Sequence, residues 1–210
     1  DLLLRDVVIE GEPGPLSVAV QDGRILAVAP DLAYAARQEI AGEGRCLIPG
    51  LVESHLHLDI ALSNDSRRPG RPEPYRSMPE LNAAIERRRR EFTHADIVER
   101  ATAALRLALR HGTTAVRAQC HLDPEIGFKH IDALQCVKEA VADWMTLQIV
   151  AFPQQGLLRD ARTPALFREA FERGADVMGG AANLDAGVPA CEHIDAAFAL
   201  VSIAHINQIH

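Results

Sequence analysis

The chain has 210 residues, of which 48% are apolar, so it is long and hydrophobic enough to bury a sizeable core. Twenty-nine acidic against 22 basic side chains give a net charge of −7, which argues against a nucleic-acid binder that relies on a basic face. No apolar run approaches the roughly 18 residues of a membrane span, the first residues lack a basic secretion signal, and the separated cysteines indicate reduced thiols. We therefore expect a cytoplasmic protein with neither a membrane nor a nucleic-acid partner.

The N-terminal domain is predicted to be residues 1–46, built from short strands and turns. Residues 2–9, 16–20 and 24–28 have the β-branched and apolar composition of strands. The Asp22-Gly23 pair between the last two strands favours a tight hairpin turn. This pattern is typical of any small antiparallel sheet.

From residue 47 to residue 210 the pattern changes to alternating strands and helices, which defines the second predicted domain. Strands are predicted at 46–52, 113–120, 147–152 and 175–180, and a loop at 67–79. Thr93 begins a helix as its N-cap and Gly112 follows its end, and further helices are predicted at 126–141, 163–173 and 190–200. Such alternation predicts an α/β fold with a parallel sheet and helices outside it.

Two histidines stand at the end of the first strand of this second domain. His55 and His57 are two residues apart, so on a strand both imidazoles project from the same face. Two neutral imidazoles that converge at the end of a buried strand form half of a metal site. The apolar strand before them and the polar segment after them favour this interpretation over a pair of incidental surface histidines.

Four segments of the chain resemble a known family. Residues 48–59 (Ile-Pro-Gly-Leu-Val-Glu-Ser-His-Leu-His-Leu-Asp) resemble the first-strand signature of the amidohydrolase superfamily, which is preceded by a small β-sandwich segment. Residues 147–156 resemble the third strand of its cytosine deaminase group, and residues 112–117 and 174–180 resemble the second and fourth. The resemblance covers residues 1 to about 200. It implies a (β/α)8 TIM barrel, of which this chain would contain the first half.

The resemblance also implies a site with one divalent metal ion, iron or zinc. His55 and His57 would be its first-strand ligands, and His210 would be a third ligand or else the last residue of an unrelated tail. Gln154 would hydrogen-bond the amide edge of a pyrimidine, or else cap a loop as a polar residue at a strand end. The catalytic residue stays unknown, because the family's catalytic Glu, sixth-strand His and eighth-strand Asp have no counterpart here.

The sequence departs from the cytosine deaminase pattern after the second strand. Gln119 stands where a histidine is expected, and His121, two residues later, is as compatible with a loop as with a metal ligand. The loop at 181–185 lacks the usual histidine and acid. The remaining histidines, which include His130 and His193, are predicted to be mostly surface or capping residues, and Arg87–Arg90 a solvated helix face.

The predicted function is metal-dependent hydrolytic deamination of a cyclic amidine such as cytosine, which releases ammonia through a metal-activated hydroxide. A related amidohydrolase that acts on isocytosine-like or aminated triazine rings is the first alternative. A partial barrel that is catalytically incompetent and serves as a binding or assembly module is an alternative of another class. The expected partners are a small heterocyclic substrate and further copies of the chain in a homo-oligomer, since a half barrel has open sheet edges.

Overall fold

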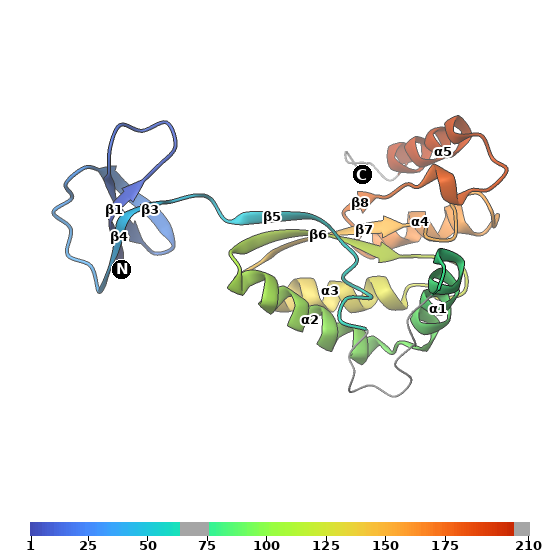
Figure 1. Cartoon of the computed structure of the whole chain (residues 1–210). Coiled ribbons are helices and arrows are strands. Elements are labelled where there is room, and N and C mark those ends of the chain that lie inside the picture. Colours follow the sequence, from blue (N-terminus) through green and yellow to red (C-terminus); the bar gives the residue numbers. More distant parts are fainter. Residues whose placement is uncertain (64–75, 204–210) are drawn as a thin grey trace. The chain divides into compact units, whose positions relative to one another are not determined.

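The computed structural model describes residues 1–63 and 76–203 and divides the chain into two compact units, Asp1–Gly50 and Leu51–His210 (Figure 1). Each unit contains one four-stranded sheet. Within the described residues, no helix combines the length and the apolar composition needed to cross a membrane.

The sheet of the first unit has the strand order β3-β2-β1-β4. Its strands are β1 (Leu2–Val8), β2 (Leu16–Gln21), β3 (Arg24–Ala29) and β4 (Gln38–Cys46). The predicted hairpin is confirmed: β2 and β3 pair antiparallel, and both Asp22 and Gly23 have the positive φ angles of a primed turn. β4 was not predicted, because its mostly polar sequence shows no hydrophobic alternation. Its strand conformation comes from its parallel pairing with β1.

The second unit alternates strands and helices, as predicted. Its elements are β5 (Leu51–Leu56), α1 (Met78–Glu91), α2 (His94–Arg110), β6 (Thr113–His121), α3 (Lys129–Val141), β7 (Thr146–Phe152), α4 (Thr163–Glu172), β8 (Val177–Met178), the short 3-10 helix η1 (Ala182–Leu184) and α5 (Ala190–Ile203). The sheet has the order β5-β6-β7-β8, and all three pairs are parallel. Consecutive parallel strands joined by helical crossovers are the repeating unit of α/β folds.

Local signals explain where α2 begins and ends. The Thr93 hydroxyl accepts a hydrogen bond from the backbone N–H of Asp96 at 3.2 Å, which confirms Thr93 as the N-cap of α2. Gly112 has a φ of 90°, as expected for a residue that ends a helix. Two details differ from the predictions: α1 begins at Met78, within the predicted loop, and Thr163 is the first residue of α4 rather than its cap.

One face of the second sheet packs against α2 and α3, which lie along it (Figure 1). Because side chains alternate along a strand, every second residue of β6 and β7 enters this core. The buried residues that these two strands and the two helices contribute to it are Val116, Ala118, Cys120, Leu147, Ile149, Ala151, Ile97, Ala101, Leu105, Ile131, Ala133, Leu134, Val137 and Val141.

The opposite face of the sheet carries the intervening residues in layers. The register pairs Arg117 with Gln148, Gln119 with Val150, and His121 with Phe152. In the first of these layers the Arg117 Nε donates to the Gln148 Oε1 at 3.0 Å. This face is therefore polar in its middle and at the carboxyl ends of the strands, where ligand sites of parallel sheets form.

Candidate metal centre

Two adjacent strands bring their ends together at the candidate site. His55 lies on β5, His57 and Asp59 follow directly after it, and His121 is the last residue of β6. β5 and β6 are parallel, with Leu56 paired to Ala118, so both strands present their carboxyl ends at the same edge of the sheet. The predicted strand 46–52 thus lies later in the chain, at Leu51–Leu56, and carries His55 itself.

His57, Asp59 and His121 form a cluster in which one potential ligand atom from each residue lies within 4.8 Å of the others. The rings of His57 and His121 have centroids 5.3 Å apart, and the His55 ring lies at the same centroid distance from His57. Phe152 from β7 packs edge-on against the His57 ring at 5.6 Å. Asp59 and His121 are buried, and His57 is half-buried.

Asp59 organises the buried side of this cluster. Its Oδ2 accepts from the backbone N–H of His121 at 3.0 Å and lies 2.7 Å from the Nδ1 of His121. The same oxygen lies 2.7 Å from the Nδ1 of His130 on α3. The other ring nitrogen of His130, Nε2, lies 3.1 Å from the Arg89 carbonyl oxygen. With Nδ1 of His121 directed at the carboxylate, Nε2 is the nitrogen left to bind a metal, an arrangement common among histidine ligands.

For Asp59 and His121, the charge of the neighbouring group opposes the effect of burial on the pKa. Burial alone would raise the pKa of Asp59, but the charges and hydrogen bonds of His121 and His130 outweigh it and hold that pKa well below its usual range. Burial alone would lower the pKa of His121, but the Asp59 carboxylate outweighs it and raises that pKa. For His57, burial and the neighbouring His121 lower the pKa, so its imidazole is neutral at pH 7 and suited to bind a metal.

Several buried polar atoms, in this cluster and on β6, lack a hydrogen-bond partner within the described part of the chain. They are the Nδ1 of His57, the Oδ1 of Asp59 and both amide atoms of Gln119. Leaving such atoms unpaired is costly, at about 1–3 kcal/mol each, so their concentration in one place calls for a ligand. Imidazole nitrogens together with a carboxylate oxygen are the donor set that zinc and iron prefer, so the residues fit a divalent metal ion.

The other predicted site residues have different positions. Gln154 lies two residues beyond β7, half-buried, with its backbone N–H donating to the Phe152 carbonyl at 3.0 Å. His210 lies outside the described residues, as do residues 67–75 of the predicted loop. His121 is a strand-end residue rather than a loop residue. Its place directly after an apolar strand was a signal that could have identified it.

One prediction about exposed polar residues was wrong: Arg89, predicted to lie on a solvated helix face, is completely buried. His130 and His193 are also buried, whereas most of the remaining histidines were predicted to be surface or capping residues. Arg89 forms ion pairs with Glu86 and with the buried Asp123. The sequence pattern of α1 could not show this, because Asp123 reaches Arg89 from the loop after β6.

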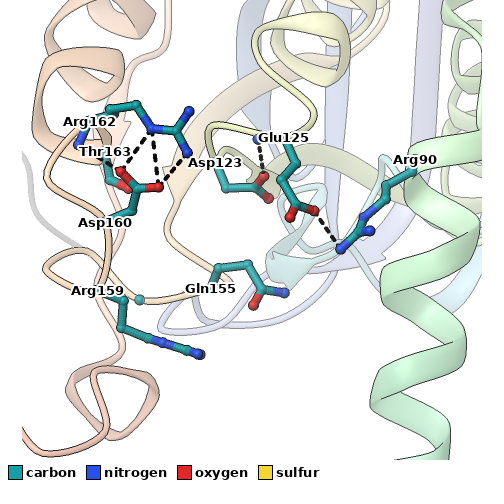
Figure 2. Close-up of a pocket in the computed structure, with 9 residues that line it drawn as sticks. Arg90, Asp123, Glu125, Gln155, Arg159, Asp160, Arg162 and Thr163 are labelled. Carbon is teal, nitrogen blue, oxygen red and sulfur yellow. Dashed lines mark hydrogen bonds and ion pairs between the residues drawn. The ribbon is translucent and has the colours of Figure 1, made fainter.

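A polar pocket of about 250 Å³ opens beside the strand ends (Figure 2). Its wall combines residues of α1, the loop after β6, the loop between β7 and α4, and the first residue of α4: Arg90, Asp123, Glu125, Gln155, Gly156, Arg159, Asp160, Arg162 and Thr163. Figure 2 shows two ion pairs in this wall, Arg90 with Glu125 at 2.5 Å and Arg162 with Asp160 at 2.6 Å. Gln155 lines this pocket, whereas Gln154 does not belong to its lining.

The chain is similar to several known proteins, although no protein-family model matches it. It is 25% identical over 183 residues to N-isopropylammelide isopropyl amidohydrolase of Pseudomonas sp. (strain ADP). The aligned region covers 86% of this chain and 45% of the relative. The structure of 5-methylcytosine deaminase from Klebsiella pneumoniae, liganded with 5-fluorocytosine, superposes with a TM-score of 0.85 at 27% identity and covers 99% of this chain and 50% of the other.

A second solved structure, N-isopropylammelide isopropylaminohydrolase from Burkholderia multivorans, superposes with a TM-score of 0.81 at 29% identity. It covers all of this chain and 53% of that protein. The chain thus spans about half the length of these relatives, and its α/β fold with a parallel sheet matches the N-terminal part of their barrels. The predicted fold class is confirmed, and the relatives and structural neighbours of the chain are deaminases and hydrolases of the amidohydrolase superfamily.

Proposed function

We propose that the protein is a metal-dependent hydrolase that deaminates a cyclic amidine such as cytosine and releases ammonia. The observation that carries this proposal is the cluster of His57, Asp59 and His121, with its unpartnered buried atoms, at the carboxyl ends of parallel strands. The similarity to a 5-methylcytosine deaminase supports a substrate with an amino-substituted pyrimidine ring.

His55 on β5, His57 and His121 would hold the metal ion through imidazole nitrogens. A bound iron or zinc ion would supply the acidification of the attacking water. Asp59 holds His121 by two contacts and so fixes the orientation of its ring. The third ligand proposed from the sequence, His210, lies outside the described residues.

The substrate would lie over the strand ends, next to the polar pocket. Gln154, two residues beyond the end of β7, is proposed to hydrogen-bond the amide edge of the ring. An amide side chain suits this role because it offers one donor group and one acceptor, as the ring edge does. Hydrogen bonds of this kind discriminate strongly between rings, because a mismatched ring leaves a buried polar group unpaired.

A second candidate substrate is an aminated triazine ring. The similarity to two N-isopropylammelide hydrolases, at 25% and 29% identity, supports it. The reaction would be the same hydrolytic displacement of an amine from a ring carbon, with an alkylamine in place of ammonia as the leaving group.

The test combines metal analysis with a substrate panel on protein expressed from its complete coding sequence. Cytosine, 5-methylcytosine, isocytosine and N-alkylated aminotriazines are assayed for release of ammonia or alkylamine. We expect metal bound in stoichiometric amount and turnover of at least one ring. His55→Ala and His57→Ala should both abolish metal binding and activity, whereas His94→Ala, at an exposed position on α2, should change neither.

Two results would contradict the proposal. One is retention of stoichiometric metal by the variant that combines His55→Ala with His57→Ala. The other is the absence of amine release from every ring of the panel by the metal-loaded wild type. Gln154→Ala should raise KM for the preferred ring and leave metal content unchanged, and an unaltered KM would exclude Gln154 as a substrate contact.

A further inference from the structure

Gln119 is a buried polar residue that the proposed mechanism does not use. Its side chain is completely buried on β6, and neither its Oε1 nor its Nε2 has a hydrogen-bond partner in residues 1–63 and 76–203. Buried amide groups in proteins are nearly always hydrogen-bonded, because burial strips them of water without compensation otherwise. The folded protein would be more stable with an apolar side chain of similar size at this position, so the amide needs a functional explanation.

The strand geometry places Gln119 beside His57. Leu56 pairs with Ala118 on adjacent parallel strands, and His57 and Gln119 are the next residue of each. Ala118 and Cys120 enter the core on the helix side, as does Leu58, so alternation directs Gln119 and His57 to the opposite face. Adjacent strands lie only about 4.8 Å apart, a spacing that an amide side chain bridges easily.

His57 has the unpartnered atom that complements Gln119. Its Nδ1 is also buried and lacks a hydrogen-bond partner among the described residues. An imidazole that binds a metal through one nitrogen carries its hydrogen on the other, and that N–H almost always donates to an oxygen atom. The carbonyl oxygen of an amide is such an acceptor.

We propose that Gln119 is a positioning residue for the metal ligand His57. In the metal-loaded protein its Oε1 accepts the Nδ1–H of His57, which leaves Nε2 of His57 to bind the metal. His121 and His57 then each have a partner, the Asp59 carboxylate for His121 and the Gln119 amide for His57. This inference rests on the proposed metal site.

The test uses three variants of the protein expressed from its complete coding sequence. Gln119→Leu keeps the volume of the side chain but removes its hydrogen bonds, and Gln119→Glu keeps an acceptor oxygen. Gln135→Leu on α3 is the matched control, because it makes the same substitution on the helix side of the sheet. The zinc dissociation constant is measured by competition with a chelator of known affinity, and the ring N–H protons of the histidines are observed by NMR.

Gln119→Leu should weaken zinc binding about 10- to 100-fold, the range typical for loss of a histidine's partner. Gln119→Glu should bind zinc at least as tightly as the wild type, and Gln135→Leu should bind it with wild-type affinity. The Nδ1–H resonance of His57 should be protected from exchange in the zinc-loaded wild type and be lost in Gln119→Leu. The melting temperature of metal-free Gln119→Leu should equal or exceed that of the wild type.

Three outcomes of the zinc and NMR measurements would overturn the inference. They are wild-type zinc affinity in Gln119→Leu, a protected Nδ1–H of His57 in that variant, or equal weakening by Gln119→Glu and Gln119→Leu. A lower melting temperature of metal-free Gln119→Leu would also contradict it, because it would reveal a structural partner of the amide. Inactivity of the wild type on every ring would reject the proposed substrates but leave these zinc and NMR results interpretable.

Discussion

Asp59 holds His121 at two points: its Oδ2 accepts the backbone N–H at 3.0 Å and lies 2.7 Å from the ring Nδ1. The backbone contact fixes the end of β6 against the segment after β5, and the ring contact fixes the orientation of the imidazole. A single buried carboxylate therefore joins the two strand ends that carry the histidines of the centre.

Asp59→Asn should weaken metal binding and destabilise the fold. The amide removes the negative charge between His121 and His130, and the metal affinity should fall about 10- to 100-fold. Both histidines remain buried but lose the carboxylate that accepts from them, so we expect the free energy of unfolding to fall by about 3 kcal/mol. Chelator competition and urea denaturation measure the two effects. Asp143→Asn, at an exposed position, is the control, and equal values for the two variants would refute the role of Asp59.

Arg89→Met should destabilise the protein by about 3–5 kcal/mol, since it leaves the buried carboxylate of Asp123 without its counter-charge. Methionine fills a similar volume, so the loss reports mainly on the ion pairs with Asp123 and Glu86. The matched control is Arg87→Met, because Arg87 is exposed on the same helix and should change stability by about 0.5 kcal/mol or less. Urea denaturation measures the stability of both variants. Similar stabilities would show that the buried ion pairs of Arg89 do not stabilise the protein.

Asp185→Asn should reduce stability in a pH-dependent manner. Asp185 lies 2.5 Å from Nδ1 of His193 and accepts the backbone N–H groups of Leu157 and Leu158 at 3.0 and 2.9 Å. Burial alone would raise the pKa of Asp185, but these hydrogen bonds outweigh it and lower that pKa. The carboxylate therefore stabilises the folded protein above the ordinary aspartate pKa of about 3.9, and this contribution disappears as the pH falls further.

The expected loss in Asp185→Asn is about 2 kcal/mol at pH 7 and a smaller value near pH 3. Urea denaturation at both values of pH measures it, with Asp195→Asn on the exposed face of α5 as the control. A difference between variant and wild type that stays constant across this range would show that ionisation of Asp185 contributes nothing to stability.

Local sequence predicted the features that depend on neighbouring residues. The hairpin at Asp22-Gly23 and the α2 helix between Thr93 and Gly112 follow from backbone preferences and capping groups a few residues apart. The alternation of apolar strands with helices was enough to predict the parallel sheet. β4 was not predicted, because its polar sequence forms a strand only by pairing with β1.

The sequence by itself determined the α/β fold and the position of His55 and His57 at the end of a strand. Only the tertiary structure decided which residues join them, since Asp59 and His121 are 62 residues apart and Asp59 and His130 are 71 apart. Those contacts depend on the register of β5 against β6 and on the packing of α3 below the sheet. Periodicity along the chain records which face a residue occupies, whereas register between strands decides which side chains meet.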